Sequence, residues 1–421
     1  MPEQNRASFA GNFSLILSVV LVLAASALPA GATESVLYSF PGGISGANPY
    51  ANLVADSTGA LYGTTGEGGG STKCNLGSGC GTVFMLSSPS WTETVLYSFQ
   101  GGTVGDGAGP QAGLVFDKKG SLYGTTASGG AYGYGTVFEL TPPTIQGGAW
   151  TETVLYSFKG GVDGSNPASG VIFDLTSLVG TTPAGGASNF GTVFEITPPK
   201  KKGGPWTEAI LYNFKGLSDG GKPYSGLVLK AKALYGTTLD GGPSSEGVVF
   251  KLVPPAGTVK VWTESVIYGF TGGSDGGKPY AGLTLGTAGV LYGTTGLGGS
   301  GGYGSVFELT PGKTGAPYTE SVLFSFTGGT TGSYARYGVI ANAAGDLFGT
   351  TGVGASNAGV VFELSPPSGS GAWSETVLWS FTGGADGGDT TAGLVLDNGL
   401  LYGTTSLGGQ YADGTVFSVV P

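Results

Sequence analysis

Carboxylates and aromatic rings are the chemical groups that this sequence offers for function. The 421 residues contain no histidine, which removes histidine-based triads, histidine-ligated metal centres and the commonest general base. No nucleophile elbow, phosphate loop or dinucleotide-binding fingerprint occurs in a credible context. The remaining chemistries are acid–base catalysis by paired carboxylates, as in glycoside cleavage, and the stacking of aromatic rings on a ligand.

Four acids interrupt the internal repetition of the sequence and are the candidates for carboxylate chemistry. They are Asp240 and Glu246, which stand in one repeat, and Asp389 and Asp413, which stand in the last. Catalysis needs different groups at one place, so on a symmetric scaffold it requires a break in the symmetry. A glycosidase or polysaccharide lyase is therefore expected only if these four acids converge on one face.

Aromatic residues recur at equivalent positions and are the candidates for ligand binding. Two sets occur: Tyr50, Tyr224 and Tyr280 just before the first predicted strand of a repeat, and Tyr134, Phe190 and Tyr303 before the third. Arg336 stands where the repeat predicts a tyrosine. Rings flanked by Gly, Ser and Asn suit stacking on sugar rings, and packing between neighbouring repeats is the alternative.

An Asp-Gly pair occurs in most of the loops that join one repeat to the next. The aspartates are Asp106, Asp163, Asp219, Asp275 and Asp386. Ordinary turn chemistry accounts for such a pair. The alternative is a ring of carboxylates at the mouth of a pore, which would bind calcium through oxygen ligands. Apart from that alternative, we expect no cofactor and no metal site.

Cys74 and Cys80 are the only cysteines, and both lie in one Gly/Ser-rich loop. An exported chain meets an oxidising environment, so we predict a disulfide between them. Two thiolates without histidine do not complete a usual zinc site. A disulfide that closes so short a loop should stabilise the loop locally and matter little to the whole fold.

Residues 1–32 have the pattern of a signal peptide. Arg6 lies in a short polar segment, an apolar run covers Leu15–Ala27, and small residues stand at the expected cleavage site near Ala32. A retained N-terminal anchor is the alternative. We expect residues 33–421 to be secreted, periplasmic or on the cell surface, with no membrane span. The net charge of −10 argues against nucleic acid and against an anionic membrane surface as partners.

Three signatures, E-T-V-L-Y-S-F, L-Y-G-T-T and G-T-V-F-E-L, each recur seven times in step with substitutions at some positions, at intervals of 55 to 59 residues for the first. Each repeat contains four short β-type runs separated by turn residues. Fixed-period repetition of four-strand units predicts an all-β fold, a seven-bladed β-propeller of four-stranded antiparallel blades. An open β-solenoid is the alternative.

The phase of the repeat predicts how the ring closes. The chain starts with a lone fourth strand, Glu34–Phe40, and ends with a third strand, Gly414–Val420. The N-terminal strand should therefore complete the last blade, which removes an open edge. The first strand of most repeats opens with glycine, with Asn52 as the exception, and these residues should converge on the propeller axis, where backbones approach closely.

The combined pattern of the three signatures resembles the GloVer (Gloeo/Verruco) tandem repeat over residues 33–421. The resemblance implies an exported bacterial protein with propeller-type repeats. Many members look as if they carry a C-terminal sorting or anchoring segment, and none is expected here because Pro421 directly follows the last predicted strand. The resemblance implies no established activity and no catalytic residue.

These observations together favour a secreted, non-enzymatic and monomeric propeller that binds an extracellular glycan or protein. The near-equivalence of the repeats and the lack of a catalytic constellation support this interpretation. A carboxylate-dependent carbohydrate-active enzyme and a purely structural component of a surface or matrix are the alternatives.

Overall fold

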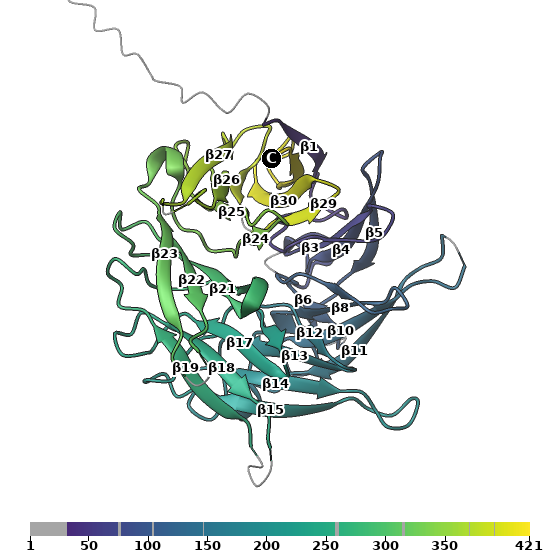
Figure 1. The fold of residues 1–421 in the computed structure, drawn as a ribbon. Helices are drawn as coiled ribbons and strands as arrows, with labels where there is room; N and C mark the ends of the chain where they lie inside the picture. The colour runs from purple at the N-terminus through teal and green to yellow at the C-terminus, as the bar shows by residue number, and fades with distance from the viewer. Residues whose placement is uncertain are drawn as a thin grey trace, which may run out of the picture.

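The computed structural model describes residues 32–74, 77–102, 105–145, 147–256, 261–313, 316–369, 371–390 and 392–421. These residues form seven four-stranded antiparallel blades that follow one another around a ring (Figure 1). Helical structure in the described residues is confined to 3-10 turns, among them η3 (Gly161–Asp163), η4 (Thr287–Gly289) and η5 (Gly329–Thr331). The prediction of an all-β, seven-bladed propeller is confirmed.

Each blade runs from an inner strand near the axis to an outer strand at the outer edge of the propeller. The inner strands are β2 (Val54–Ala55), β7 (Val115–Phe116), β12 (Ile172–Asp174), β16 (Val228–Lys230), β20 (Thr284–Leu285), β24 (Ile340–Ala341) and β29 (Val395–Asp397). The second strands are β3 (Leu61–Thr65), β8 (Leu122–Thr126), β13 (Ser177–Thr182), β17 (Ala233–Thr238), β21 (Leu291–Thr295), β25 (Leu347–Thr351) and β30 (Leu400–Leu407).

The two remaining strands of each blade are longer and more uniform. The third strands are β4 (Thr82–Ser87), β10 (Thr136–Thr141), β14 (Thr192–Thr197), β18 (Val248–Val253), β22 (Ser305–Thr310), β26 (Val360–Ser365) and β31 (Thr415–Val419). The outer strands are β5 (Thr92–Ser98), β11 (Thr151–Ser157), β15 (Thr207–Asn213), β19 (Thr263–Gly269), β23 (Thr319–Ser325), β27 (Ser374–Ser380) and β1 (Glu34–Ser39). Short additional pairings join β6 (Gly107–Ala108) to β9 (Ser128–Gly129), and β28 (Gly388–Thr390) to β30.

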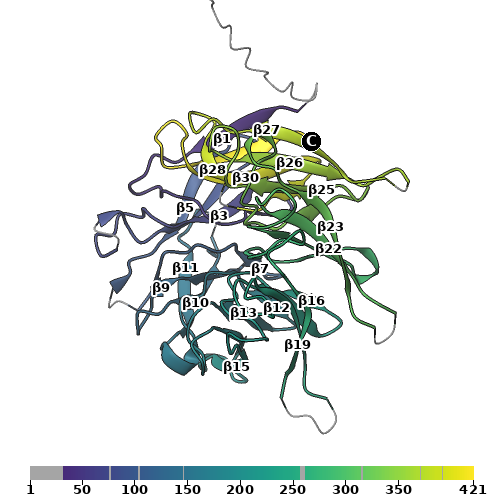
Figure 2. The same ribbon diagram turned by 90° about the vertical axis from the view of Figure 1, so that its left-hand side faces the viewer.

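The N-terminal strand β1 pairs antiparallel with β31 and serves as the outer strand of the last blade. The register runs from Glu34 opposite Val419 to Ser39 opposite Thr415. Figure 2 shows β1 lying along the strands of the last blade. Phe40, which follows β1, is fully buried and packs edge-on against Phe84 of the first blade, with ring centroids 5.0 Å apart. The two ends of the chain therefore share one blade.

The glycine of L-Y-G-T-T makes room for the phenylalanine of G-T-V-F-E-L. In the fourth blade, a Cβ added to Gly236 would lie 2.6 Å from Cζ of Phe250 and 3.0 Å from Leu227. Phe250 is fully buried, so neither ring nor strand has space to shift. The same contact recurs between Gly403 and Phe417 in the last blade. Two signatures of the repeat are thus the two sides of one packing contact.

The two threonines of L-Y-G-T-T bind in different directions. The hydroxyl of the first, Thr237, donates to the carbonyl of Ala281 on the inner side of the next blade (2.8 Å). The hydroxyl of the second threonine bonds within its own blade. In the third blade, Thr182 shares a 2.8 Å hydrogen bond with Thr192 of the third strand. Equivalent first threonines link the other neighbouring blades, and Thr404 reaches the carbonyl of Ala51 (3.5 Å) across the closing joint.

A β-bulge interrupts the pairing of the third and outer strands in all seven blades. In the first blade Val83 lies opposite Tyr97 and Phe84 opposite Val95, so Leu96 has no partner. A bulge changes the direction in which the following side chains point. This explains why E-T-V-L-Y-S-F does not alternate strictly, and it directs Tyr97 toward the joint with the next blade.

The predicted disulfide between Cys74 and Cys80 is present. Cys80 is fully buried and belongs to a hydrophobic cluster with Val83 and Phe99. Both sulfurs pack against Gly101, where an added Cβ would lie 2.5 Å from Sγ of Cys74. The disulfide therefore lies against the loop that leads into the second blade.

The predicted signal peptide, residues 1–32, lies outside the described residues except for Ala32. Among the described residues, no helix has the length and apolar character that crossing a membrane requires.

Candidate ligand-binding site

A cavity of about 450 Å³ runs along the propeller axis and is lined by residues from all seven blades. One residue per blade, placed just before the inner strand, forms what we call the rim of this cavity. The described rim residues are Tyr50, Gln111, Ala168, Tyr224, Tyr280 and Arg336. Three of the six predicted aromatic ligand-binding residues, and the predicted arginine, therefore line the same cavity.

A repeated backbone turn places each rim residue beside the axis. In the fourth and fifth blades it consists of a residue with a left-handed backbone, Lys222 (φ 55°) or Lys278 (φ 54°), followed by proline. Proline fixes its own φ, so the direction of the next residue is set. The amide of Lys222 donates to the carbonyl of Phe190 (2.8 Å), which anchors the turn to the preceding blade.

Below the rim the backbones of the inner strands come close to one another, as the glycine pattern predicts. A Cβ added to Gly170 would lie 2.7 Å from the carbonyl oxygen of Gly113 in the neighbouring blade. Asn52 occupies the equivalent position in the first blade, and its side-chain oxygen accepts a hydrogen bond from the amide of Gly393 (2.7 Å). Asn52 thus adds an amide group to the cavity wall at the joint where the ring closes.

The rim is chemically uneven, because its rings and its positive charge gather on one side. The rings of Tyr224 and Tyr280 are 6.4 Å apart. The guanidinium of Arg336 lies over two rings, 5.4 Å from the centroid of Tyr280 and 5.5 Å from that of Tyr334. An adjoining cavity of about 330 Å³ is lined by Arg336, Tyr50, Tyr334 and Tyr337, among others.

Two phenols at this end of the cavity are held in their protonated form. Burial raises the pKa of Tyr50, and the nearby carboxylates of Glu67 and Asp389 raise it further. Burial likewise raises the pKa of Tyr337, with a further contribution from Asp389. A phenol with a raised pKa donates hydrogen bonds and is a poor general base. The arrangement therefore suits recognition of a polar ligand.

The second aromatic set does not line the axial cavity. The ring of Tyr134 packs on Gly160, that of Phe190 on Gly216 and that of Tyr303 on Gly328, each in the loop that leads to the next blade. Phe190 belongs to a hydrophobic cluster, whereas Tyr134 and Tyr303 each keep 45% of their surface exposed. For this set, the structure shows the packing between neighbouring units that was the alternative to ligand contact.

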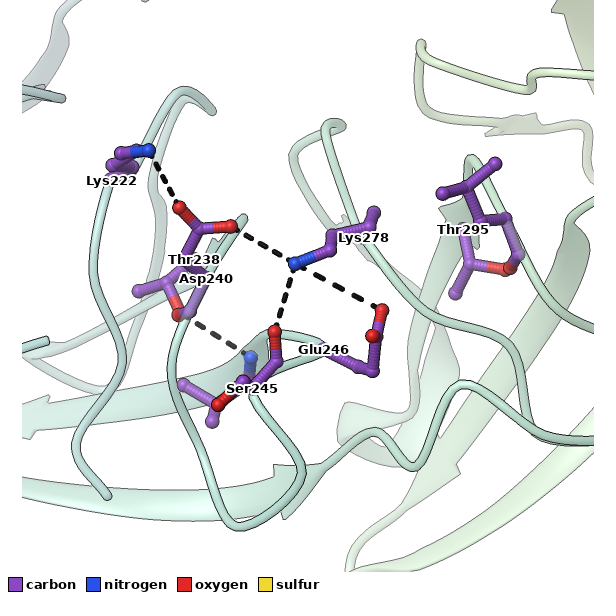
Figure 3. Close-up of polar contacts among 9 residues, drawn as sticks. Lys222, Thr238, Asp240, Ser245, Glu246, Lys278 and Thr295 are labelled. Atoms are coloured by element: carbon purple, nitrogen blue, oxygen red, sulfur yellow. Dashed lines mark hydrogen bonds and ion pairs between the residues drawn. The ribbon is translucent and has the colours of Figure 1, made fainter. Parts of the chain in front are cut away.

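Asp240 and Glu246 are engaged in a salt-bridge network with two lysines (Figure 3). Lys222 lies 2.8 Å and Lys278 3.0 Å from the carboxylate of Asp240, and Lys278 lies 3.9 Å from that of Glu246. Burial alone would raise the pKa of Asp240, but the hydrogen bonds from the two lysines outweigh it and lower the pKa. A carboxylate held ionised between two ammonium groups is not a general acid.

The acids of the last blade make different contacts, and no contact in the described part of the chain joins them to Asp240 or Glu246. Asp389 lines the adjoining cavity and accepts a hydrogen bond from the hydroxyl of Ser406 (3.1 Å). Asp413 packs against Gly42 in the loop between the last and first blades. No group of three or more Asp, Glu, Cys or His side chains in the described part of the chain could hold a metal ion. The acids of blades four and seven make separate contacts because the loops that carry them are separated around the ring.

The aspartates of the Asp-Gly pairs act as turn residues and are not among the residues that line the axial cavity, so the structure supports the turn interpretation over a carboxylate ring at the pore mouth. Asp106 accepts hydrogen bonds from the backbone amide of Gln100 (2.7 Å) and from the hydroxyl of Tyr97 (3.2 Å) in the outer strand β5. The same backbone contact is made by Asp163, Asp219, Asp275 and Asp386. These carboxylates close turns beside the outer strands, away from the residues that line the axis.

Sequence reasoning missed Lys222, Lys278, Gln111 and Tyr337 as residues of this end of the molecule. A signal for the two lysines was present, because D-G-G-K-P-Y occurs twice, ending at Tyr224 and at Tyr280. That hexapeptide contains the turn aspartate, the lysine with the left-handed backbone and the rim tyrosine. No local pattern marks Tyr337, which replaces the alanine or serine of other repeats.

The family model described as the Gloeobacter/Verrucomicrobia repeat matches residues 26–205 and 203–417. The chain belongs to this repeat family. The two matches together cover nearly the whole propeller, in agreement with the seven recurring signatures. No curated protein matches this chain.

Solved structures share the fold at low sequence identity. A Bacteroides uniformis protein assigned as a 6-phosphogluconolactonase is 15% identical, with a TM-score of 0.52 over 82% of this chain and 88% of its own. Chaetomium thermophilum Sqt1, solved with the N-terminus of the ribosomal protein L10, is 12% identical (TM-score 0.50, 92% and 99% covered). A puromycin-hydrolyzing peptidase of Mycobacterium tuberculosis is 10% identical (TM-score 0.50, 87% and 52% covered). At these identities the similarity concerns the fold alone.

Proposed function

We propose that this protein is an exported, non-catalytic binding module that holds part of an extracellular glycan in its axial cavity. The observation that carries this proposal is the grouping of Tyr50, Tyr224 and Tyr280 with Arg336 at the rim of that cavity. Tyrosine rings stack on the apolar face of a sugar, and their hydroxyls hydrogen-bond to its polar edge. A volume of about 450 Å³ lies within the usual range for small-molecule sites.

The wall of the cavity supports a polar ligand. Besides the tyrosines, Asn52, Gln111 and Ser225 present amide and hydroxyl groups to it. Such groups donate and accept hydrogen bonds, which matches the hydroxyls of a sugar. Apolar side chains such as Leu283 share the lining, so the cavity combines an apolar body with a few polar contacts.

The state of the acids and phenols favours binding over catalysis. Asp240 is ion-paired with two lysines, and the raised pKa of Tyr50 and Tyr337 keeps both phenols protonated. Export is supported by the signal-peptide pattern of residues 1–32 and by the disulfide between Cys74 and Cys80.

The test begins with a glycan array probed with residues 33–421, followed by calorimetry with the best oligosaccharide. Replacing Tyr280 by alanine removes stacking of roughly 0.5–1.5 kcal/mol, so Kd should rise roughly 2- to 12-fold. Tyr303→Ala is the matched control, because it removes a solvent-accessible tyrosine ring that lies off the cavity, and it should leave Kd unchanged.

Two outcomes would contradict the proposal. One is the absence of binding to any glycan on the array. The other is a Kd that stays the same in the triple variant Tyr50→Ala, Tyr224→Ala, Tyr280→Ala while the protein remains folded by circular dichroism. Either result would remove the axial cavity as a glycan site.

A further inference from the structure

We infer that the axial cavity selects a carboxylate-bearing sugar, such as a uronic acid, and that Arg336 receives the carboxylate. This inference rests on the proposed function, because it names the class of glycan that the same site takes.

Arg336 is the single arginine among the described residues, and the whole sequence contains one other, Arg6. The chain carries a net charge of −10, so positive charge is scarce in it. The other repeats have tyrosine, glutamine, alanine or threonine at the position equivalent to Arg336. The arginine therefore stands at the axial cavity in place of a neutral residue, and no packing requirement of the repeat accounts for it.

The guanidinium of Arg336 has no protein partner that satisfies it. It is solvent-exposed and lies over the rings of Tyr280 and Tyr334, at 5.4 Å and 5.5 Å from their centroids. Within the described part of the chain, no carboxylate forms a salt bridge with it and no oxygen accepts a hydrogen bond from it. Its N–H groups are therefore available to a ligand in the cavity.

The neighbouring charges do not neutralise Arg336. Lys222 and Lys278 are already paired with Asp240, and Lys278 also with Glu246, so these four charges balance one another. Asp389 lines the adjoining cavity with Arg336, but its carboxylate accepts the hydroxyl of Ser406 and makes no salt bridge with the arginine. The unpaired guanidinium of Arg336, next to tyrosine rings that can stack on a sugar, therefore favours a sugar that carries a negative charge.

The geometry of arginine favours a carboxylate in particular. Its planar fork offers two parallel N–H donors that match the two oxygens of a carboxylate. The contacts with Tyr280 and Tyr334 limit the motion of that plane before a ligand arrives, which reduces the entropy lost on binding. A uronic acid combines such a carboxylate with a ring that Tyr280 and Tyr224 can stack on.

The experiment compares trigalacturonic acid with its carboxyl-reduced, neutral counterpart by calorimetry on residues 33–421. The wild type should bind the acid about tenfold or more tightly, as expected for a charged hydrogen-bonded pair. Arg336→Gln should abolish that preference, because it should weaken binding of the acid and leave binding of the neutral counterpart unchanged. Arg336→Lys should restore part of the preference for the acid. Lys118→Gln, on the exposed turn between β7 and β8, removes one positive charge elsewhere and should change neither affinity.

Three results would overturn the inference: no binding of the acid, equal affinity for the acid and its neutral counterpart, or an unchanged preference in Arg336→Gln. Tighter binding of a sulfated oligosaccharide than of the uronate would overturn the choice of carboxylate. The proposed function is judged separately, since it survives all of these results if a neutral glycan binds and Tyr280→Ala weakens that binding.

Discussion

The hydroxyl of Tyr38 donates a 2.9 Å hydrogen bond to the carboxylate of Glu93 across the joint where the ring closes. Tyr38 belongs to the N-terminal strand β1 and Glu93 to the outer strand β5 of the first blade. Between most other blades an aspartate of the connecting loop joins the same arrangement, as Asp106 does between Tyr97 and Glu152. Most joints between blades therefore place a glutamate and an aspartate close to each other.

The glutamates at these joints take up protons near neutral pH. Burial, and in most joints the neighbouring aspartate, raises the pKa from 4.5 to about 7 for Glu34, Glu152, Glu208, Glu264, Glu320 and Glu375. In the described residues, one oxygen of each of these carboxyls is buried without a hydrogen-bond partner. A buried carboxyl without a basic partner is favoured in its neutral form.

Stability should therefore fall as the pH rises from 5 to 8. A glutamate whose folded pKa is above its unfolded value stabilises the fold fully below about pH 4.5, and this contribution is lost as the pH rises through 7. We expect Tm to drop by about 1 °C or more, since roughly 1 kcal/mol shifts Tm by about 1 °C in a propeller of this length at about 2.1 cal/mol/K of unfolding entropy per residue. Thermal melts at constant ionic strength between pH 5 and pH 8 measure this change in Tm.

Glu152→Gln provides the matching variant, because glutamine keeps the shape of the neutral acid and does not ionise. The difference in Tm between pH 5 and pH 8 should shrink in this variant and stay unchanged in the control Glu195→Gln, which alters the third strand β14. A Tm that rises with pH in the wild type would contradict this account of the joints.

Removing β1 should open the ring. A variant that starts at Pro41 loses the partner of β31 and the buried ring of Phe40, whose loss alone costs about 3–5 kcal/mol. The exposed edge of β31 should then promote association, visible by light scattering after size-exclusion chromatography. A peptide of residues 33–41 added in trans should restore a monodisperse protein. Equal Tm and equal size for the two lengths would show that the closing strand is dispensable.

Adding a methyl group at Gly236 should destabilise the fourth blade. The new Cβ of Gly236→Ala would lie 2.6 Å from Phe250, and overpacking of this kind costs about 1–3 kcal/mol. Gly226→Ala is the control in the same blade, since an added Cβ there meets no atom within 4 Å. Urea unfolding should separate the two variants, and equal midpoints would mean that the contact between glycine and phenylalanine is not the reason for the glycine.

Breaking the disulfide should have a cost that depends on which cysteine is changed. Cys74→Ser and Cys80→Ser remove the same covalent bond, but only Cys80 is fully buried, beside Val83 and Phe99. A hydroxyl placed there without a partner costs about 1–3 kcal/mol, so Cys80→Ser should be the less stable variant by that amount. Equal stability in chemical unfolding would place the whole effect in the covalent link.

The sequence by itself determined the repeat and nearly all of the secondary structure. Each signature describes a contact within one blade or between neighbouring blades, such as Gly236 against Phe250 or Thr237 against Ala281. Contacts of that kind recur at a fixed spacing, so seven copies of a pattern are enough to predict seven blades and the closing role of Glu34–Phe40. The bulge at Leu96 escaped notice because it inserts a residue without changing the repeat.

Only the tertiary structure decided which side chains share the axial cavity. Tyr50 and Tyr280 are 230 residues apart in the sequence and meet at one rim because the ring closes, whereas Tyr303, only 23 residues after Tyr280, packs on a loop outside it. The tertiary structure also decided which charges meet. Lys278 binds Asp240 of the preceding blade, while no carboxylate in the described part of the chain forms a salt bridge with Arg336. A cavity on an axis is formed by residues at one height in every blade. Spacing along the chain does not reveal that height, because it depends on the turn before each inner strand.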